Sequence, residues 1–99
     1  MTENPLEIIR DADPELFNLT EITRSTALGE GAIPMKYKLL IAMALDAAEG
    51  AEEGVMVLAM QAMAEGATKD EIMEAVRIAH FISGIGSVYT AARGLKNIK

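Results

Sequence analysis

Residues 39–45 read Leu-Leu-Ile-Ala-Met-Ala-Leu, and residues 55–64 read Val-Met-Val-Leu-Ala-Met-Gln-Ala-Met-Ala. Ala, Leu and Met favour helices, and neither stretch alternates between apolar and polar residues as a half-buried strand would. Each stretch is apolar on every side of a helix, which predicts a helix that is buried all round. A chain of 99 residues has too little volume to surround two such helices by itself. We therefore expect an obligate homo-oligomer with both helices near the interface; the alternative is a monomer with an exposed apolar patch, which is rare.

Helix start and stop signals predict that the rest of the chain is helical too. Asn4-Pro5 and Asp13-Pro14 each read as an N-cap followed by proline at the first helical position, and Pro34 opens a further helix. The expected fold is all-α, a single domain over residues 1–99. The predicted helices cover about residues 5–10, 14–28, 34–49, 52–65, 69–83 and 87–96.

Two helix ends carry more specific signals. Gly29 follows the second predicted helix and is expected to be its left-handed C-cap. The run Thr68-Lys69-Asp70-Glu71 matches a capping box, in which the Thr and Glu side chains each bond to the other residue's backbone N–H.

Composition excludes several classes of function. Fifteen acidic and nine basic residues give a net charge of −6, which disfavours nucleic acid as a partner. The chain has no cysteine, which excludes disulfides, thiolate metal sites and thiol redox chemistry. No secretory signal opens the chain, and the longest apolar run, residues 39–45, is too short to span a bilayer. We expect a soluble, cytoplasmic protein without a membrane segment, metal or cofactor.

The single histidine is a candidate general acid or base. His80 lies four residues after Val76 and seven after Met73, which predicts that it lies on the apolar face of its helix. A histidine in such a pocket exchanges protons near neutral pH. The alternative is a structural histidine bonded to a backbone carbonyl, which is the more common role.

Two charged groups are further candidates. Glu52 and Glu53 follow Glu49 and could share a proton or bind a hard cation, although a helix start alone explains acidic residues there. Lys36 and Lys38 flank Tyr37 in a first helical turn and could bind an anionic substrate. Cations at a helix start oppose the macrodipole, so helix stability does not explain them, although solvated surface charge does.

Several segments resemble the carboxymuconolactone decarboxylase-like family. They are Pro5-Leu-Glu-Ile-Ile, Asp13-Pro-Glu-Leu-Phe, Ile33-Pro-Met-Lys-Tyr-Lys-Leu-Leu-Ile-Ala-Met-Ala-Leu, Ala64-Glu-Gly-Ala-Thr-Lys-Asp-Glu-Ile-Met-Glu-Ala-Val and Ala79-His-Phe-Ile-Ser-Gly-Ile-Gly. The likeness covers nearly the whole chain. It implies an all-helical, alkyl hydroperoxidase D-like fold that assembles as a homotrimer or homohexamer. The family includes lactone decarboxylases and thiol peroxidases.

The chain departs from the family's peroxidase site. In the peroxidase branch a Glu, a Cys-x-x-Cys pair and a His form a proton relay to a reactive thiol. The corresponding positions here, counted back without gaps from Gly66-Ala67-Thr68, are Leu39, Ala51, Gly54 and Leu58. None of these side chains can attack a substrate or transfer a proton, so peroxidase activity is not expected.

Two hypotheses of different kinds follow. The first is a non-redox oligomer that binds a small molecule or acts as a scaffold, with Ala51, Gly54 and Leu58 lining an enlarged, more apolar pocket. The second is a lactone-acid decarboxylase that works without cysteine. In it, His80 transfers the proton, Lys36 or Lys38 holds the substrate carboxylate, and Glu52 or Glu53 serves as a second acid or base.

Overall fold

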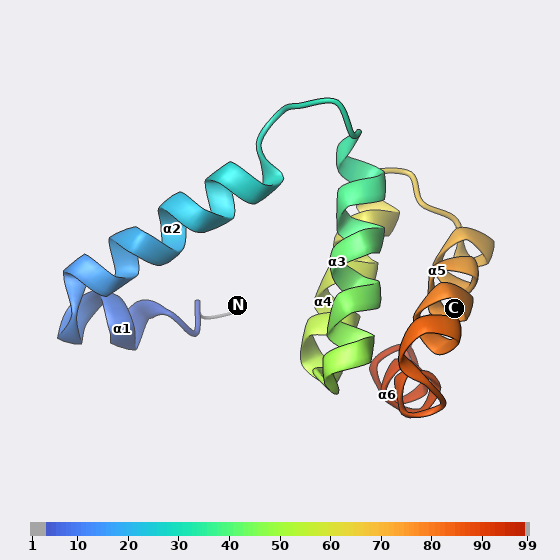
Figure 1. Ribbon diagram of the computed structural model, residues 1–99. Coiled ribbons are helices and arrows are strands. Elements are labelled where there is room, and N and C mark those ends of the chain that lie inside the picture. The colour runs from blue at the N-terminus through green and yellow to red at the C-terminus, as the bar shows by residue number, and fades with distance from the viewer. Residues whose placement is uncertain (1–3, 99) are drawn as a thin grey trace. The chain divides into compact units, whose positions relative to one another are not determined.

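The computed structural model describes residues 4–98, and every regular element within that range is an α-helix. The all-α prediction with about six helices is confirmed (Figure 1). The helices are α1 (Glu7–Ala12), α2 (Pro14–Leu28), α3 (Met35–Glu49), α4 (Glu52–Ala64), α5 (Lys69–Ser83) and α6 (Gly86–Gly94). No helix in the described range is long and apolar enough to cross a membrane.

The chain divides into two units, residues up to Gly31 and residues from Ala32 onward. The N-terminal unit is α1 packed with α2. The Asp13 side chain accepts a hydrogen bond from the Leu16 backbone N–H at 3.1 Å and so caps α2, as predicted. Neither helix has a buried residue, because two short helices cannot enclose a core. The single-domain prediction stays a prediction.

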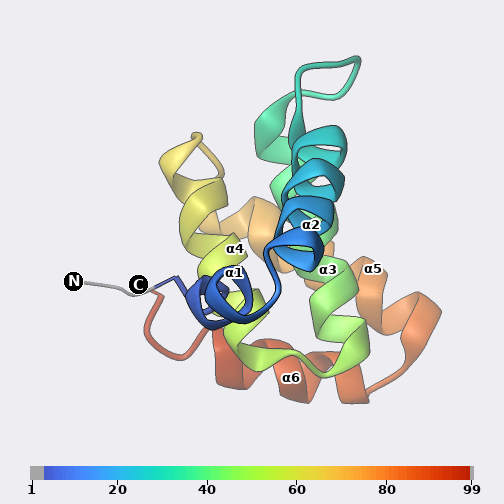
Figure 2. The same cartoon turned by 90° about the vertical axis from the view of Figure 1, so that its left-hand side faces the viewer.

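The C-terminal unit is a bundle of four helices. The two residues Gly50 and Ala51 join α3 to α4, and these helices lie side by side in both ribbon views (Figures 1 and 2). Helix α5 packs on α3, and α6 lies across one end of the bundle, where it contacts α3, α4 and α5. The largest fully buried side chains are Met43, Val55 and Ile72, one from each of α3, α4 and α5.

Most predicted helix ends are confirmed. Gly50 ends α3 in the left-handed conformation, with φ of 83°, which glycine adopts at little cost. The Thr68–Glu71 capping box is complete, since each side chain bonds to the other residue's backbone N–H. Two predictions are wrong. Gly29 was expected to be a left-handed C-cap, but its backbone is extended, with φ of −69° and ψ of 171°. The first helix was expected to begin at Pro5 with Asn4 as its N-cap, but α1 begins at Glu7, and the Asn4 side chain accepts from the Leu6 N–H in a turn before the helix.

The two helices that are apolar on every side are only partly covered within one chain. Met43 and Val55 are fully buried, whereas Ile41 and Leu45 on α3 and Met60 on α4 remain exposed. The C-terminal unit therefore covers one side of each helix and leaves apolar residues of both on its surface.

Candidate functional site

An apolar groove runs between α3 and α5 on the surface of the C-terminal unit. Its volume is about 570 Å³, which is within the range of small-molecule sites. Its polar lining is confined to a few groups, and aliphatic side chains supply the rest. The residues that line it are Tyr37, Leu40, Ile41, Ala44, Leu45 and Ala48 from α3, and Glu71, Glu74, Ala75, Ile78, Ala79, Ile82 and Ser83 from α5. Small residues, Ala44 on α3 and Ala75 on α5, leave the space between the helices that larger side chains would fill.

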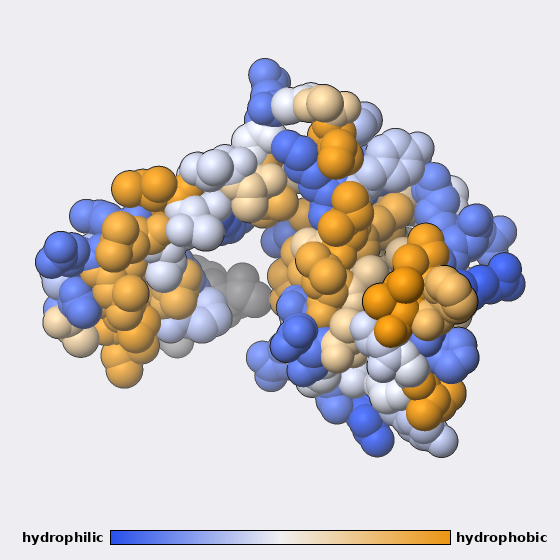
Figure 3. All heavy atoms as spheres, in the orientation of Figure 1, coloured by the Kyte–Doolittle hydropathy of each residue, from blue (hydrophilic) through white to orange (hydrophobic). Residues whose placement is uncertain are grey.

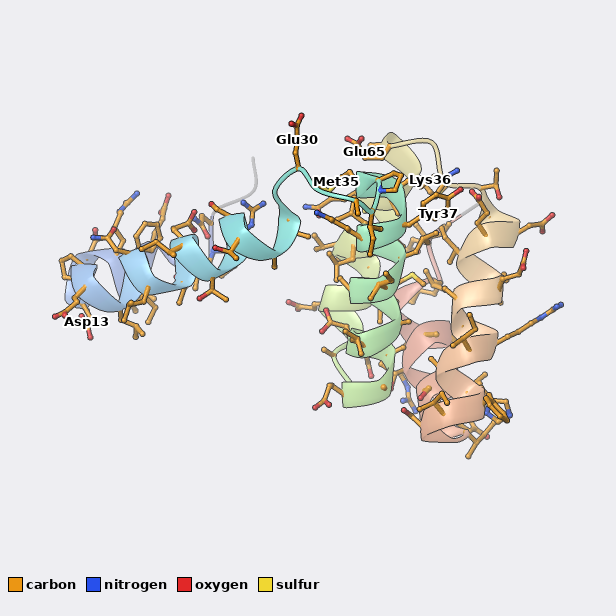
Figure 4. All side chains as sticks on the ribbon, turned by 45° about the horizontal axis from the view of Figure 1, so that its top comes forward. Asp13, Glu30, Met35, Lys36, Tyr37 and Glu65 are labelled. Carbon is orange, nitrogen blue, oxygen red and sulfur yellow. The ribbon has the colours of Figure 1, made fainter. Side chains whose placement is uncertain are left out.

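An ion pair joins the two helices at the end of the groove where both begin. The Lys36 Nζ donates to Glu71 Oε2 at 3.2 Å, and both side chains are about a quarter to a third exposed. Lys36 also lies 4.8 Å from the centre of the Tyr37 ring, a cation–π distance. Figure 4 labels Lys36 and Tyr37 at the start of α3. The contact links the first turn of α3 to the first turn of α5, 35 residues further along the chain.

The same contacts shift two pKa values. The pKa of Glu71 lies below its ordinary value of 4.5, chiefly because the carboxylate accepts from the Thr68 backbone N–H at 2.9 Å and then because Lys36 donates to it. The pKa of Lys36 lies above its ordinary value of 10.5, chiefly because of the hydrogen bond to Glu71. Both groups are therefore charged at neutral pH. The positive charge of Lys36, which was expected to bind an anionic substrate, is largely neutralised by the Glu71 carboxylate.

The remaining catalytic candidates lie away from Lys36. Glu52 and Glu53 occupy the first turn of α4, and Glu52 pairs with Arg93 of α6 at 3.7 Å in an exposed contact. Lys36 is at the opposite end of α3, and the helix is about 20 Å long at 1.5 Å per residue. Within one chain, Lys36 and these glutamates therefore cannot contact the same small molecule.

His80 was predicted to lie in a pocket on the apolar face of α5, and this is wrong for a single chain. The residues of α5 that face the core are Ile72, Val76 and Ala79, whereas His80 is exposed. A helix turns by about 100° per residue, so His80, one step after Ala79, lies at the edge of the apolar face rather than on it. It does not line the groove. Its predicted role in proton transfer stays a prediction.

Three of the positions that correspond to the family's relay lie against other parts of the C-terminal unit rather than in an open site. Leu39 is buried, and Leu58 is half-buried against the core. A Cβ atom added to Gly54 would overlap the carboxylate of Asp46, which lies directly against this glycine. None of Ala51, Gly54 and Leu58 lines the α3–α5 groove. The space that the small residue Gly54 was expected to leave for a pocket is occupied by the Asp46 side chain.

Asp46 is the residue that the sequence analysis missed. Its neighbourhood depends on the contact between the end of α3 and the first turn of α4, and the spacing between residues 46 and 54 does not reveal it. The α5 side of the groove was also missed, because Ala75 and Ile78 carry no chemical signature of a site. Among residues 4–98, no three acidic or histidine side chains gather closely enough to hold a metal ion.

Comparison with known proteins places this helical architecture in a defined class. The family model described as the carboxymuconolactone decarboxylase family matches residues 14–97. The chain belongs to this family.

A solved structure resembles it along most of its length: the apo form of a carboxymuconolactone decarboxylase family protein from Legionella pneumophila. It has a TM-score of 0.85 and 30% sequence identity, over 92% of this chain and 81% of that one. The search of curated proteins found no match. The family resemblance predicted from the sequence is confirmed.

Proposed function

We propose that the protein is a homo-oligomeric member of the family, a trimer or hexamer, that binds a small apolar molecule without thiol chemistry. The observation that carries this proposal is the groove between α3 and α5, whose walls are mostly aliphatic. The absence of cysteine removes the only side chain that could serve as a thiolate nucleophile. Ligand pockets that are apolar with a few polar groups at one end orient a ligand by that end.

The polar groups of the groove indicate which ligands fit. Glu71 and Glu74 both line it, and Tyr37 supplies a phenol hydroxyl at the end held by the Lys36–Glu71 pair. Two carboxylates disfavour a third negative charge, so we expect a neutral molecule with one hydrogen-bonding group in preference to the anionic one suggested by Lys36 and Lys38.

Methyl NMR tests the groove directly. Titration with 2-naphthol, a neutral probe, should produce saturable shifts in the δ-methyl signals of Ile41, Ile78 and Ile82. Ala75→Phe fills the groove and should abolish these shifts. Ala64→Phe adds the same volume at an exposed site at the end of α4 and should leave them unchanged. Equal shifts in the Ala75→Phe protein, or binding of 2-naphthoate as tight as that of 2-naphthol, would contradict the proposed site or its ligand preference.

A peroxidase assay tests the other half of the proposal. The purified protein should reduce cumene hydroperoxide no faster than buffer when a dithiol is supplied as reductant, because no residue can form the sulfenic acid intermediate. Turnover that scales with protein concentration would contradict the non-redox assignment.

The alternative function is that of a lactone-acid decarboxylase, which the family's name favours. Within one chain Lys36 lies far from Glu52 and Glu53, so this mechanism requires residues from two copies to meet. The test is release of carbon dioxide from an unsaturated lactone that bears a carboxylate. Turnover that is lost in His80→Ala would support this enzyme, and turnover that is unchanged would remove histidine from its mechanism.

A further inference from the structure

Large apolar side chains are exposed where α5 turns into α6. Phe81 is 85% exposed and Ile82 73%, and beyond the turn at Gly84 Ile85 and Tyr89 are also mostly exposed. We call these four residues the α5–α6 corner. Isolated apolar residues on a surface need no explanation, but four large ones around one turn form the kind of patch that marks an interaction site.

Charge is distributed very unevenly along the sequence. Residues 75–99 contain four basic residues, Arg77, Arg93, Lys96 and Lys99, and no acidic one. Residues 1–74 contain all fifteen acidic residues and five basic ones. The guanidinium of Arg93 lies 5.8 Å from the ring centre of Tyr89 and also pairs with Glu52 at 3.7 Å in an exposed contact. Arg77 lies one helical turn before Phe81 on α5 and brings a second positive charge to the corner. A partner for this surface should therefore be apolar and acidic.

The N-terminal unit has this chemistry. Leu16, Leu19 and Ile22 follow one another at three-residue steps along one side of α2, and all three are exposed. Residues 4–31 contain six acidic and two basic side chains, and neither helix has a buried residue. Figure 3 shows apolar side chains at the surface of α1 and α2. A helix pair without buried side chains gains little stability by itself, so this unit also needs a partner.

We infer that α2 of one copy docks through Leu16, Leu19 and Ile22 on the α5–α6 corner of a second copy. This contact joins two different surfaces, so it propagates head to tail and closes into a ring when the rotation permits. Ile82 belongs both to the corner and to the groove lining, so the docked helix covers one end of the groove. The inference rests on the proposed self-association and names its surfaces.

Cysteine cross-linking tests the contact, because the natural chain contributes no thiol of its own. Leu19→Cys and Phe81→Cys proteins are prepared separately, mixed and oxidised gently. A disulfide requires the two Cα atoms to approach within about 7 Å. A mixture of the two should give a cross-linked pair at least about tenfold more abundant than a mixture of Phe81→Cys with Asp70→Cys, an exposed position in the first turn of α5, because docking raises the effective concentration. Since the two cysteines are on different chains, the product reports contact between copies.

The oligomer mass, measured by light scattering, distinguishes failure of the docking inference from failure of the proposed self-association. The natural protein should be a closed oligomer, Phe81→Glu should lower its mass, and Met73→Glu, at an exposed position on α5, should not. An oligomer that is broken by Met60→Glu on α4 but not by Phe81→Glu, or that gives no Leu19–Phe81 cross-link, would overturn the inference and leave self-association in place. A monomeric natural protein would overturn both, and its sedimentation with phosphatidylserine vesicles would assign the corner to a membrane surface instead.

Discussion

Gly94 is the position where the packing of α6 is most sensitive to one added carbon. It is the last residue of α6, and a Cβ placed there would lie 2.7 Å from the carbonyl oxygen of Glu52 and 2.8 Å from Cβ and Cγ1 of Val55. One obstacle is backbone in the first turn of α4, and the other belongs to a fully buried side chain. Neither can rotate away, so Gly94→Ala must push α6 from α4.

The size of the effect follows from two opposed contributions. Overpacking a tight contact costs about 1–3 kcal/mol. Replacing glycine by alanine within a helix gains about 0.5–1 kcal/mol, and less at a helix end. We expect Gly94→Ala to lower the free energy of unfolding by about 1–2 kcal/mol, which corresponds to a melting temperature lower by roughly 4–15 °C in a chain of this length.

Gly86 supplies a matched control on the same helix. It is the first residue of α6, its φ is not positive, and nothing lies within 4 Å of an added Cβ. Gly86→Ala should therefore stabilise the protein by about 0.4–1 kcal/mol through the loss of unfolded-state freedom. The assay is urea unfolding followed by circular dichroism at 222 nm, with protein concentration held fixed because the proposed self-association would make stability depend on it.

A double variant identifies the clash itself. Val55→Ala removes the Cγ1 atom that obstructs residue 94, so adding Gly94→Ala in that background should cost less than in the natural protein, with a coupling of about 1 kcal/mol. A Gly94→Ala protein as stable as the natural one would refute the packing argument, and an equal cost in both backgrounds would assign the clash to the Glu52 carbonyl oxygen and the residue 55 Cβ instead of Cγ1.

Three further changes test other parts of the structure. Met43→Ala leaves a cavity at the centre of the C-terminal unit and should lower the free energy of unfolding by about 2–5 kcal/mol in the same urea assay. Thr68→Ala removes the hydroxyl that accepts from the Glu71 N–H and should cost about 0.5–2 kcal/mol, whereas Thr68→Ser should cost less. Glu71→Gln should lower the melting temperature at pH 7 and flatten its fall below pH 4.5. The lowered pKa of Glu71 means that its carboxylate stabilises the fold above that pH, and the stabilisation is lost as acid protonates it. A melting temperature that falls equally in both proteins between pH 7 and pH 3 would contradict this.

The helices were predictable because their signals are local. Asp13-Pro14 and the Thr68–Glu71 box act within one turn of the chain, and the structure has both as predicted. Gly29 shows the limit of such signals: glycine permits the left-handed conformation but does not impose it, and the chain leaves α2 in an extended conformation towards the following loop.

The candidate site was less predictable because it depends on pairs of helices. Lys36 was identified from its position at a helix start, but its partner Glu71 lies 35 residues away and was recognised only as a cap. Asp46 had no signal of its own, since its contact with Gly54 depends on how α3 turns into α4. The position of His80 was wrong by a single helical step, which is enough to move a side chain from a covered face to an exposed one.

The absence of buried side chains in residues 4–31 bears on how the protein is made. A ribosome synthesises α1 and α2 first, yet this unit has no core to hold it. Helices α3 and α4 are joined by only two residues, so their pairing closes a very short loop, and we expect the C-terminal unit to fold first although it is synthesised after the N-terminal unit. During that interval the nascent chain exposes Leu19 and Ile22 to the cell. The docking inferred above would end this exposure only once a second copy has folded its C-terminal unit.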